Sequence, residues 1–163
     1  MPVDISVIIV TYNSASCIAA CVESVLAQTE VMFEVLVVDN ASTDNTLARL
    51  KGMPCRVIAS TENLGFGRGN NLGFASSSGR YIYLLNPDAR LVAKNSLAEL
   101  CRRMDANPRW GMAGTQILSA DGQAQGRPAT DYPGSRHVHR DFSKLPGDIA
   151  WIMGASKIGR AHV

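Results

Sequence analysis

Apolar runs alternate with helix-type patterns along the first ninety residues, and this alternation restricts the possible folds more than any other feature. The runs cover Ile5–Val10, Phe33–Val38, Arg56–Ala59 and Tyr81–Leu85. The first and second are almost uninterrupted, and the fourth is wholly apolar, which is typical of strands buried on both faces of a parallel sheet. Right-handed crossovers between such strands put helices on both faces of the sheet. The sequence therefore predicts an α/β fold with a mostly parallel sheet.

The segments between and after these runs carry the 3.6-residue spacing of amphipathic helices. The first helix is expected to be capped by Asn13 or Ser14, which are good N-cap residues. The second is short and is expected to turn Leu47 and Leu50 inward. A later helix spans about residues 93–106. Its predicted apolar stripe consists of Leu97, Leu100, Cys101 and Met104.

A stretch rich in Gly and Asn follows the third run, at Asn63–Gly73 (NLGFGRGNNLG). We expect Asn63–Asn71 to form a loop over one edge of the sheet and to lead into a helix that ends near Ser78. Small residues such as Gly69 would let that helix lie close to the strands. The stretch lacks the G-K-[ST] of a Walker A motif, and its glycines do not follow the first strand as a dinucleotide fingerprint requires.

The chain after residue 108 is harder to interpret from its sequence. Met112–Leu118 is expected to be a strand, followed by a turn at 120–122 and a returning strand at Gln123–Arg127. Residues 128–147 show no period and are expected to form a loop. No element is predicted for residues 156–163.

Composition excludes several classes of protein. The chain has 163 residues and a formal net charge of +2, which suits one domain and argues against a nucleic-acid binder. The absence of a signal-type leader and of a long apolar window predicts a soluble, cytoplasmic protein. Cys17 and Cys21 are four residues apart, and reduced core thiols are a better interpretation than a metal pair because no CxxC or nearby His completes a site.

Three polar corners follow the first, second and fourth predicted strands. Because the carboxyl ends of parallel strands meet at one edge of a sheet, these corners should lie together, and open α/β sheets bind ligands at that edge. Taken alone, each corner could be a plain turn or a helix cap. The corners are Thr11-Tyr12-Asn13, Asp39-Asn40 and Asn86-Pro87-Asp88.

The residue types at these corners suit a nucleoside diphosphate. The ring of Tyr12 can form a flat wall for a base, and the carboxylate of Asp39 can accept the imide N–H of uracil or thymine. Asp88 is a hard oxygen ligand for Mg²⁺ or Mn²⁺ that also binds a diphosphate. Backbone N–H groups of the Gly/Asn stretch can point at phosphate oxygens. Together these features favour a nucleotide-diphosphate site.

Four segments in this order also resemble the family 2 glycosyltransferases, and most closely their bacterial rhamnosyltransferase-like branch. The resemblance covers about residues 3 to 155. The segments that carry it are Ile5–Asn13 (ISVIIVTYN), Val37–Thr46 (VVDNASTDNT), Asn63–Gly73 and Tyr81–Asp88 (YIYLLNPD).

The resemblance implies a GT-A fold, a Rossmann-like sheet, and an enzyme that transfers a sugar from a UDP- or dTDP-sugar with inversion. It makes dTDP-rhamnose the leading donor and a saccharide or lipid-linked molecule the acceptor, in cell-envelope or polysaccharide synthesis. Asp88 would be the metal ligand, and Asn86 replaces the first acid of the family's D-x-D motif. The substrate-binding residues it implies are Thr11, Tyr12, Asn13, Asp39, Asn40, Asn63, Gly67, Asn70, Asn86 and Asp88.

In the family, the acceptor-binding half and the general base follow the matched region. The resemblance therefore predicts an incomplete, C-terminally truncated domain at residues 1–155, an unmatched tail at 156–163 and no catalytic base within the chain. The alternative function is a non-catalytic nucleotide-sugar binding or interaction fragment that lacks the acceptor half. With either function the protein could form a homo-oligomer and could lie peripherally at the inner face of the membrane. His137 and His139 could bind a metal or act as a base but suit a solvated loop better, and Trp151 suits a core position.

Overall fold

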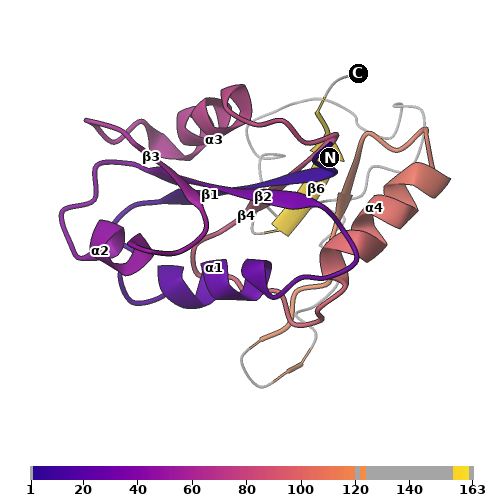
Figure 1. Cartoon of the computed structure of the whole chain (residues 1–163), viewed down its shortest axis with the longest axis horizontal. Coiled ribbons are helices and arrows are strands. Elements are labelled where there is room, and N and C mark those ends of the chain that lie inside the picture. Colours follow the sequence, from indigo (N-terminus) through magenta and orange to yellow (C-terminus); the bar gives the residue numbers. More distant parts are fainter. Residues whose placement is uncertain (1, 120–121, 124–155, 162–163) are drawn as a thin grey trace, which may run out of the picture.

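One mixed sheet organises the molecule (Figure 1). The computed structural model describes residues 2–119, 122–123 and 156–161. Its strands are β1 (Ile5–Thr11), β2 (Phe33–Asp39), β3 (Arg56–Ala59), β4 (Tyr81–Leu85), β5 (Met112–Gly114) and β6 (Ser156–Arg160). They are ordered β3-β2-β1-β4-β6-β5, with β1 to β4 parallel and β6 antiparallel to both of its neighbours. The prediction of a mostly parallel sheet is confirmed.

Helices cover both faces of the sheet, as predicted (Figure 1). The helices are α1 (Ile18–Leu26), α2 (Thr46–Leu50), α3 (Gly65–Ala75) and α4 (Ser96–Ala106). We call the side covered by α1, α2 and α4 the α1 face, and the opposite side, covered by α3, the α3 face. Because side chains alternate along a strand, Val7 and Ile9 of β1 pack on the α1 face, whereas Ile8 and Val10 pack on the α3 face.

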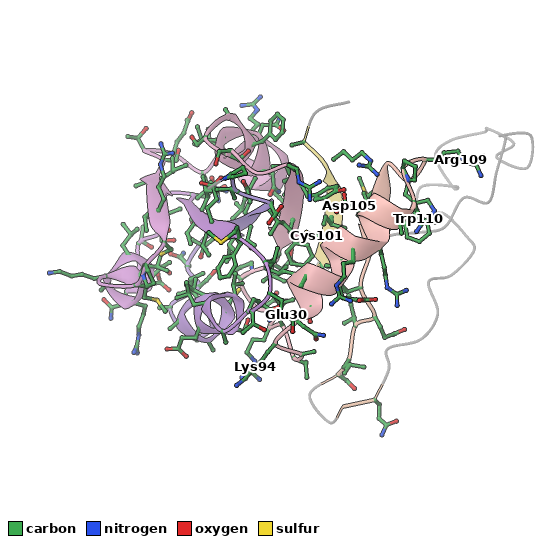
Figure 2. The ribbon with its side chains drawn as sticks, turned by 45° about the vertical axis from the view of Figure 1, so that its right-hand side comes forward. Glu30, Lys94, Cys101, Asp105, Arg109 and Trp110 are labelled. Atoms are coloured by element: carbon green, nitrogen blue, oxygen red, sulfur yellow. The ribbon has the colours of Figure 1, made fainter. Side chains whose placement is uncertain are left out.

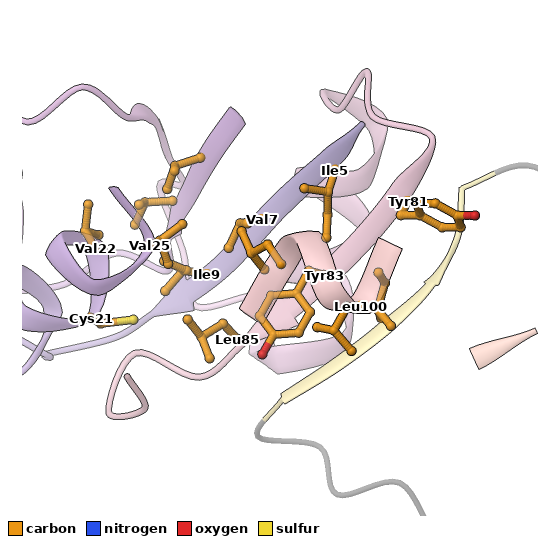
Figure 3. Packing of buried hydrophobic residues seen from close by; sticks show 14 of the residues in the cluster. Ile5, Val7, Ile9, Cys21, Val22, Val25, Tyr81, Tyr83, Leu85 and Leu100 are labelled. Atoms are coloured by element: carbon orange, nitrogen blue, oxygen red, sulfur yellow. The ribbon is translucent and has the colours of Figure 1, made fainter. Parts of the chain in front are cut away.

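The larger core lies on the α1 face (Figure 3). There Val7 and Ile9 pack with Val22 of α1 and with Tyr83 of β4, and all four are fully buried. Burying apolar side chains from a sheet and its helices together supplies most of the driving force for such a fold. The run of buried residues along β1 therefore places this strand at the centre of the molecule.

The apolar stripe predicted for α4 is confirmed, because all four of its residues are buried. Figure 2 shows Cys101 on the side of α4 that faces the sheet. The helix carries Asp105 near its end, where the carboxylate accepts hydrogen bonds from the hydroxyl of Tyr81 and the guanidinium of Arg80. These bonds fasten the end of α4 to the start of β4.

The Gly/Asn stretch differs from the expected loop, because the helix α3 begins at Gly65 and includes most of it. The predicted close approach to the sheet is confirmed. A Cβ atom added to Gly69 would lie 2.8 Å from Val10 Cγ1, and one added to Gly73 would lie 2.5 Å from Ile8 Cγ2. Gly69 and Gly73 therefore serve close packing of a helix on the sheet rather than the flexibility of a loop.

Residues 156–160 form β6, the strand that joins β4 to β5. Ile158 is fully buried in the larger core, and the hydroxyl groups of Ser156 and Tyr83 are hydrogen-bonded. Arg160 donates hydrogen bonds to the carbonyl oxygens of Met104 (2.8 Å) and Trp110 (3.2 Å). The segment that lacked a predicted element is thus an interior strand of the sheet.

Three smaller expectations were wrong. The strand after α4 ends at Gly114, not Leu118. Leu47 is exposed, whereas Leu50 is buried as expected. The first helix begins at Ile18, and no side chain caps it. The N–H of Ile18 donates instead to the backbone carbonyl oxygen of Ser14. The strand predicted at 123–127 and the loop at 128–147 lie almost entirely outside the described residues.

Candidate functional site

The strand ends bring the predicted polar corners to one edge of the sheet. Thr11 and Asp39 are register partners at the ends of β1 and β2, and the N–H of Asn40 donates to the carbonyl oxygen of Thr11 (2.8 Å). On the other side of β1, Ile9 pairs with Leu85, the last residue of β4. The segment that starts at residue 86 therefore leaves the sheet at the same edge, as the sequence predicted.

Asp39 is an enclosed acidic residue at this edge, with 1% of its surface exposed. Its Oδ1 accepts a hydrogen bond from the hydroxyl of Ser42 (2.5 Å), and its Oδ2 accepts one from the N–H of the same residue (3.0 Å). An ionised carboxylate offers about four acceptor positions. Two positions of Asp39 therefore remain for another donor.

The turns after β1 and β2 are tied to each other by side chains. The N–H of Asn13 donates to Ser42 Oγ (2.9 Å), and Asn13 Oδ1 accepts the N–H of Thr43 (2.8 Å). Asn13 has φ 49° and Ala41 has φ 60°, both in the left-handed region. Asn visits this region readily, but Ala does so at a cost of about 1–2 kcal/mol. The hydrogen bonds across the turns hold these conformations.

The amide groups of Asn40 and Asn70 both bond to the first turn of α3. The amide group of Asn40 donates to the carbonyl oxygen of Gly65 (3.3 Å), and that of Asn70 donates to the carbonyl oxygen of Phe66 (2.9 Å). These bonds fix which end of each amide is the oxygen. The first turn of α3 therefore lies beside the end of β2.

Three buried polar atoms at this edge have no hydrogen-bond partner among the described residues. They are Thr11 Oγ1, Asn40 Oδ1 and Asn70 Oδ1, and the residues that carry them are at least nine-tenths buried. Buried polar atoms are nearly always paired in folded proteins. Their concentration at the carboxyl ends of β1 and β2 marks this edge as the part of the described structure with unmet hydrogen bonding.

Asn86 and Asp88 form the third corner, beside α1. The carbonyl oxygen of Asn86 accepts the thiol of Cys21 (3.4 Å), while Asp88 is exposed. Burial raises the pKa of the Cys21 thiol to about 12, and the neighbouring Cys17 and Asp88 add to the rise. The carboxylate of Asp88 is thus within electrostatic reach of the buried start of α1. Cys17 and Cys21 are free thiols, and the prediction of core or boundary positions is confirmed.

The corner at Asn86 and Asp88 suits a divalent metal that binds together with a diphosphate. Among residues 2–119, 122–123 and 156–161, no three His, Cys, Asp or Glu side chains are grouped to hold an ion. Asp88 therefore offers a single carboxylate. Mg²⁺ is often held by one or two carboxylates together with substrate phosphates and water, so one exposed carboxylate is compatible with a metal that binds with a diphosphate.

The remaining predicted residues frame the edge. Tyr12 is half-exposed, which leaves its ring available for stacking. Asn63 Oδ1 accepts the N–H of Gly65 (2.9 Å), so this side chain helps to start α3. Gly67 and Arg68 lie exposed on the first turns of that helix. His137, His139 and Trp151 lie outside the described residues.

The sequence did not indicate a groove of about 220 Å³ on the α3 face. Asn70 and Phe74 of α3 line one side of it, and Ile82 and Leu84 of β4 form part of its floor. On α3, Asn70 and Phe74 are four residues apart and so share one side of the helix. This groove could have been predicted only if the Gly/Asn stretch had been interpreted as a helix.

No helix in the described part of the chain has the length and apolar character needed to cross a bilayer.

Known structures share this fold. Residues 1–349 of TarS from S. aureus, in complex with UDP, align with a TM-score of 0.67 and 24% identity, over 79% of this chain and 40% of that one. The mannosyltransferase PcManGT from Pyrobaculum calidifontis, in complex with GDP-Man and Mn²⁺, aligns with a TM-score of 0.65 and 24% identity, over 73% and 38% of the two chains. The predicted GT-A fold is confirmed.

Sequence comparison gives the family. The succinoglycan biosynthesis protein ExoO of Rhizobium meliloti (strain 1021) is 34% identical over 125 residues, which are 74% of this chain and 36% of that protein. The chondroitin synthase of Pasteurella multocida (strain Pm70) is 39% identical over 101 residues, 60% of this chain and 10% of the synthase. The chain spans about a third of the length of the first curated relatives it matches, at 36%, 30% and 35%. The model of glycosyl transferase family 2 matches residues 6–158, and the chain therefore belongs to that family.

Proposed function

We propose that this chain binds a nucleoside-diphosphate sugar at the edge formed by the ends of β1, β2 and β4, and that it is the donor-binding part of an inverting glycosyltransferase. The observation that carries the proposal is that three oxygens at this edge are buried without a hydrogen-bond partner among the described residues: Thr11 Oγ1, on the side of Asp39, and Asn40 Oδ1 and Asn70 Oδ1, on the α3 face. Each buried acceptor without a partner costs about 1–3 kcal/mol. A ligand that supplied N–H or O–H groups, once a local shift of the neighbouring side chains had opened these atoms to it, would recover part of that cost.

The ten predicted residues divide by chemistry. The exposed ring of Tyr12 suits stacking on a base, and the two free acceptor positions of Asp39 suit an imide N–H. Asn40 and Asn70 turn fixed amide oxygens inward, so a base edge or ribose hydroxyl group that donates hydrogen bonds would complement them. Thr11, Asn13, Asn63 and Gly67 shape the turns and the start of α3 around these groups.

Asp88, with Asn86 beside it, is the proposed holder of Mg²⁺ or Mn²⁺. Such an ion, when bound, would neutralise charge on the departing diphosphate. The residues of this chain bind and orient the nucleotide so that the anomeric carbon faces an acceptor hydroxyl group. In-line attack on a correctly held donor gives inversion. Holding the donor in that orientation lowers the activation barrier of the transfer.

The finer identity of the substrates rests on motif resemblance. The rhamnosyltransferase-like motifs favour a pyrimidine nucleotide, UDP or dTDP, with dTDP-rhamnose as donor. Relatives named for succinoglycan biosynthesis and chondroitin synthesis support a role in polysaccharide assembly, with a saccharide or lipid-linked acceptor. We place this activity in the cytoplasm, where nucleotide sugars are made.

Calorimetry of the chain with UDP, dTDP and GDP, each with Mn²⁺, tests the binding proposal. We expect the two pyrimidine nucleotides to bind and GDP to bind more weakly. If none binds at millimolar concentration, the proposed function is wrong.

Turnover separates the transferase from the alternative function, a non-catalytic nucleotide-sugar binding fragment. Release of UDP or dTDP from the sugar nucleotide at a rate typical of enzymes, about 1 per second or faster, would support the transferase. Binding of the intact donor without turnover would support the binding fragment.

A further inference from the structure

Ser42 is one of the residues that join the two turns at the site. Its hydroxyl oxygen accepts the N–H of Asn13 (2.9 Å) and donates its proton to Asp39 Oδ1 (2.5 Å), while its own N–H donates to Asp39 Oδ2 (3.0 Å). Three hydrogen bonds thus converge on one small side chain and its backbone. The bond to Asn13 joins segments that lie 29 residues apart in the sequence, and the two bonds to Asp39 close the turn after β2.

A second link runs parallel to the first and does not use the Ser42 hydroxyl. Asn13 Oδ1 accepts the N–H of Thr43 at 2.8 Å and the hydroxyl of Thr43 at a longer 3.3 Å. Asn13, in the turn after β1, is therefore held by two successive residues of the turn after β2, Ser42 and Thr43. The removal of a single hydroxyl should loosen this junction without abolishing the fold.

The junction matters because strained backbone flanks the predicted nucleotide contacts. Asn13, at φ 49°, directly follows Tyr12, and Ala41, at φ 60°, directly follows Asn40. Asn adopts this region readily, but the left-handed conformation of Ala41 costs about 1–2 kcal/mol and persists only where its surroundings determine it. Ser42 and Asp39 are the surroundings that determine Ala41, since their mutual hydrogen bonds close the turn that contains it.

We infer that Ser42 is a positioning residue for the donor nucleotide. It orients the enclosed carboxylate of Asp39 and fixes the turn of Tyr12 relative to that of Asn40, without itself being a ligand of the nucleotide. The inference rests on the proposed function and extends it to a residue outside the predicted contact set. A preorganised site loses less conformational freedom on binding, so loosening the junction weakens affinity.

Nucleotide titrations of four proteins test this inference, at a temperature where urea unfolding shows each to be folded. Ser42→Ala should weaken binding of UDP or dTDP with Mn²⁺ by about tenfold, the effect of 1.4 kcal/mol. Ser42→Thr keeps the hydroxyl and should remain within about threefold of the wild type. Ser77→Ala is the matched control. Among the described residues, the Ser77 hydroxyl bonds to the carbonyl oxygen of Phe74 at the far end of α3 and to nothing at the site, so the nucleotide affinity of this variant should be unchanged.

A double-mutant cycle separates positioning from direct contact. Asp39→Asn removes one acceptor of the Ser42 pair, so Ser42→Ala should add little to its effect if Ser42 acts through Asp39. Fully additive losses would mean that Ser42 does not act through Asp39, and would overturn the inference that it orients that carboxylate. Wild-type affinity in Ser42→Ala, or failure of Ser42→Thr to restore binding, would also overturn it.

Two further outcomes are distinguishable. If Ser42→Ala does not fold, Ser42→Cys replaces it, because Cys keeps the volume but is a weak hydrogen-bond donor. The nucleotide affinity of Ser42→Cys should then decrease by about tenfold, as expected for Ser42→Ala. An unchanged affinity would contradict the positioning role. If the wild-type chain binds no nucleotide, the proposed function fails first, and the inference that rests on it fails with it.

Discussion

Gly73 of α3 lies so close to Ile8 of β1 that no side chain fits between them. A Cβ atom at Gly73 would be 2.5 Å from Ile8 Cγ2 and 3.2 Å from Val38 Cγ2. Real Cβ atoms do not approach carbon so closely, because such distances are well inside van der Waals contact. The distance between α3 and the sheet is therefore set by this glycine, and with it the position of Asn70 one turn earlier.

Gly73→Ala should lower the free energy of unfolding by about 1–3 kcal/mol, the usual cost of overpacking a filled core. Gly67→Ala is the matched control on the same helix, since a Cβ there would meet nothing within 4 Å. Alanine is a better helix former than glycine, so Gly67→Ala should stabilise the protein by up to about 1 kcal/mol. Urea unfolding of both variants measures the difference, and equal effects would contradict the packing model.

The same glycines explain why the sequence predicted α3 only in part. Gly and Asn are poor helix formers, so local propensity favours a loop over Asn63–Asn71. The helix forms because its small residues let it pack on β1, and such tertiary contacts override propensity. The closeness of Gly69 and Gly73 to the sheet could be predicted from residue size, whereas the start of the helix could not.

Ile158→Ala should destabilise the protein by about 2–5 kcal/mol, as expected for truncation of a fully buried aliphatic side chain. Lys157→Ala, on the neighbouring position of β6 and the opposite face, should change stability by less than about 0.5 kcal/mol. Thermal unfolding of both variants tests whether β6 is an interior strand. A small effect at Ile158 would mean that β6 contributes little to the sheet.

The strand ends were predictable and β6 was not, for a physical reason. Long apolar runs such as Ile5–Val10 signal burial on both faces, and the polar residue that follows each run then falls at the sheet edge. The sequence of β6, SKIGR, has one large apolar residue, and its burial depends on partners distant in the chain. The hydrogen bonds of Ser42 were also hidden, because sequence spacing does not reveal which turns meet.

Acid should weaken the attachment of α4 to β4. Hydrogen bonds from Arg80 and then from Tyr81 hold the pKa of Asp105 below its usual value, and burial, a smaller cause, opposes them. A carboxyl group whose pKa is lower in the folded state stabilises that state above its unfolded pKa of about 3.9, and the benefit is lost as pH falls through the folded value.

The urea concentration at the midpoint of unfolding should accordingly decrease as the pH is lowered from 5 to 3. This range brackets the reference pKa of about 3.9. Asp105→Asn should reduce that fall, because the variant has no carboxyl group to protonate at this position. Glu23→Gln removes the same charge from the exposed side of α1 and serves as the comparison. An identical acid dependence in the wild type and Asp105→Asn would show that Asp105 does not link stability to pH.

Asp88→Ala should abolish the part of nucleotide binding that depends on a divalent metal. In the described structure Asp88 is the exposed carboxylate at the end of the β4 segment, and no cluster of three ligands accompanies it. A metal held by one carboxylate must take its other ligands from the diphosphate and water. Mn²⁺ alone should therefore bind the wild type weakly, and Mn²⁺ and UDP or dTDP should strengthen each other's binding, as linkage requires.

Calorimetry with and without EDTA separates the two contributions. With Mn²⁺, the variant should bind UDP or dTDP at least about tenfold more weakly than the wild type, a loss of 1.4 kcal/mol or more. In EDTA the two proteins should bind the nucleotide equally, because the base and ribose contacts at β1 and β2 are intact. Asp88→Asn, which keeps an oxygen ligand but not its charge, should be intermediate. If Mn²⁺ strengthens nucleotide binding equally in the wild type and in Asp88→Ala, the ion is held elsewhere and Asp88 has no role as its ligand.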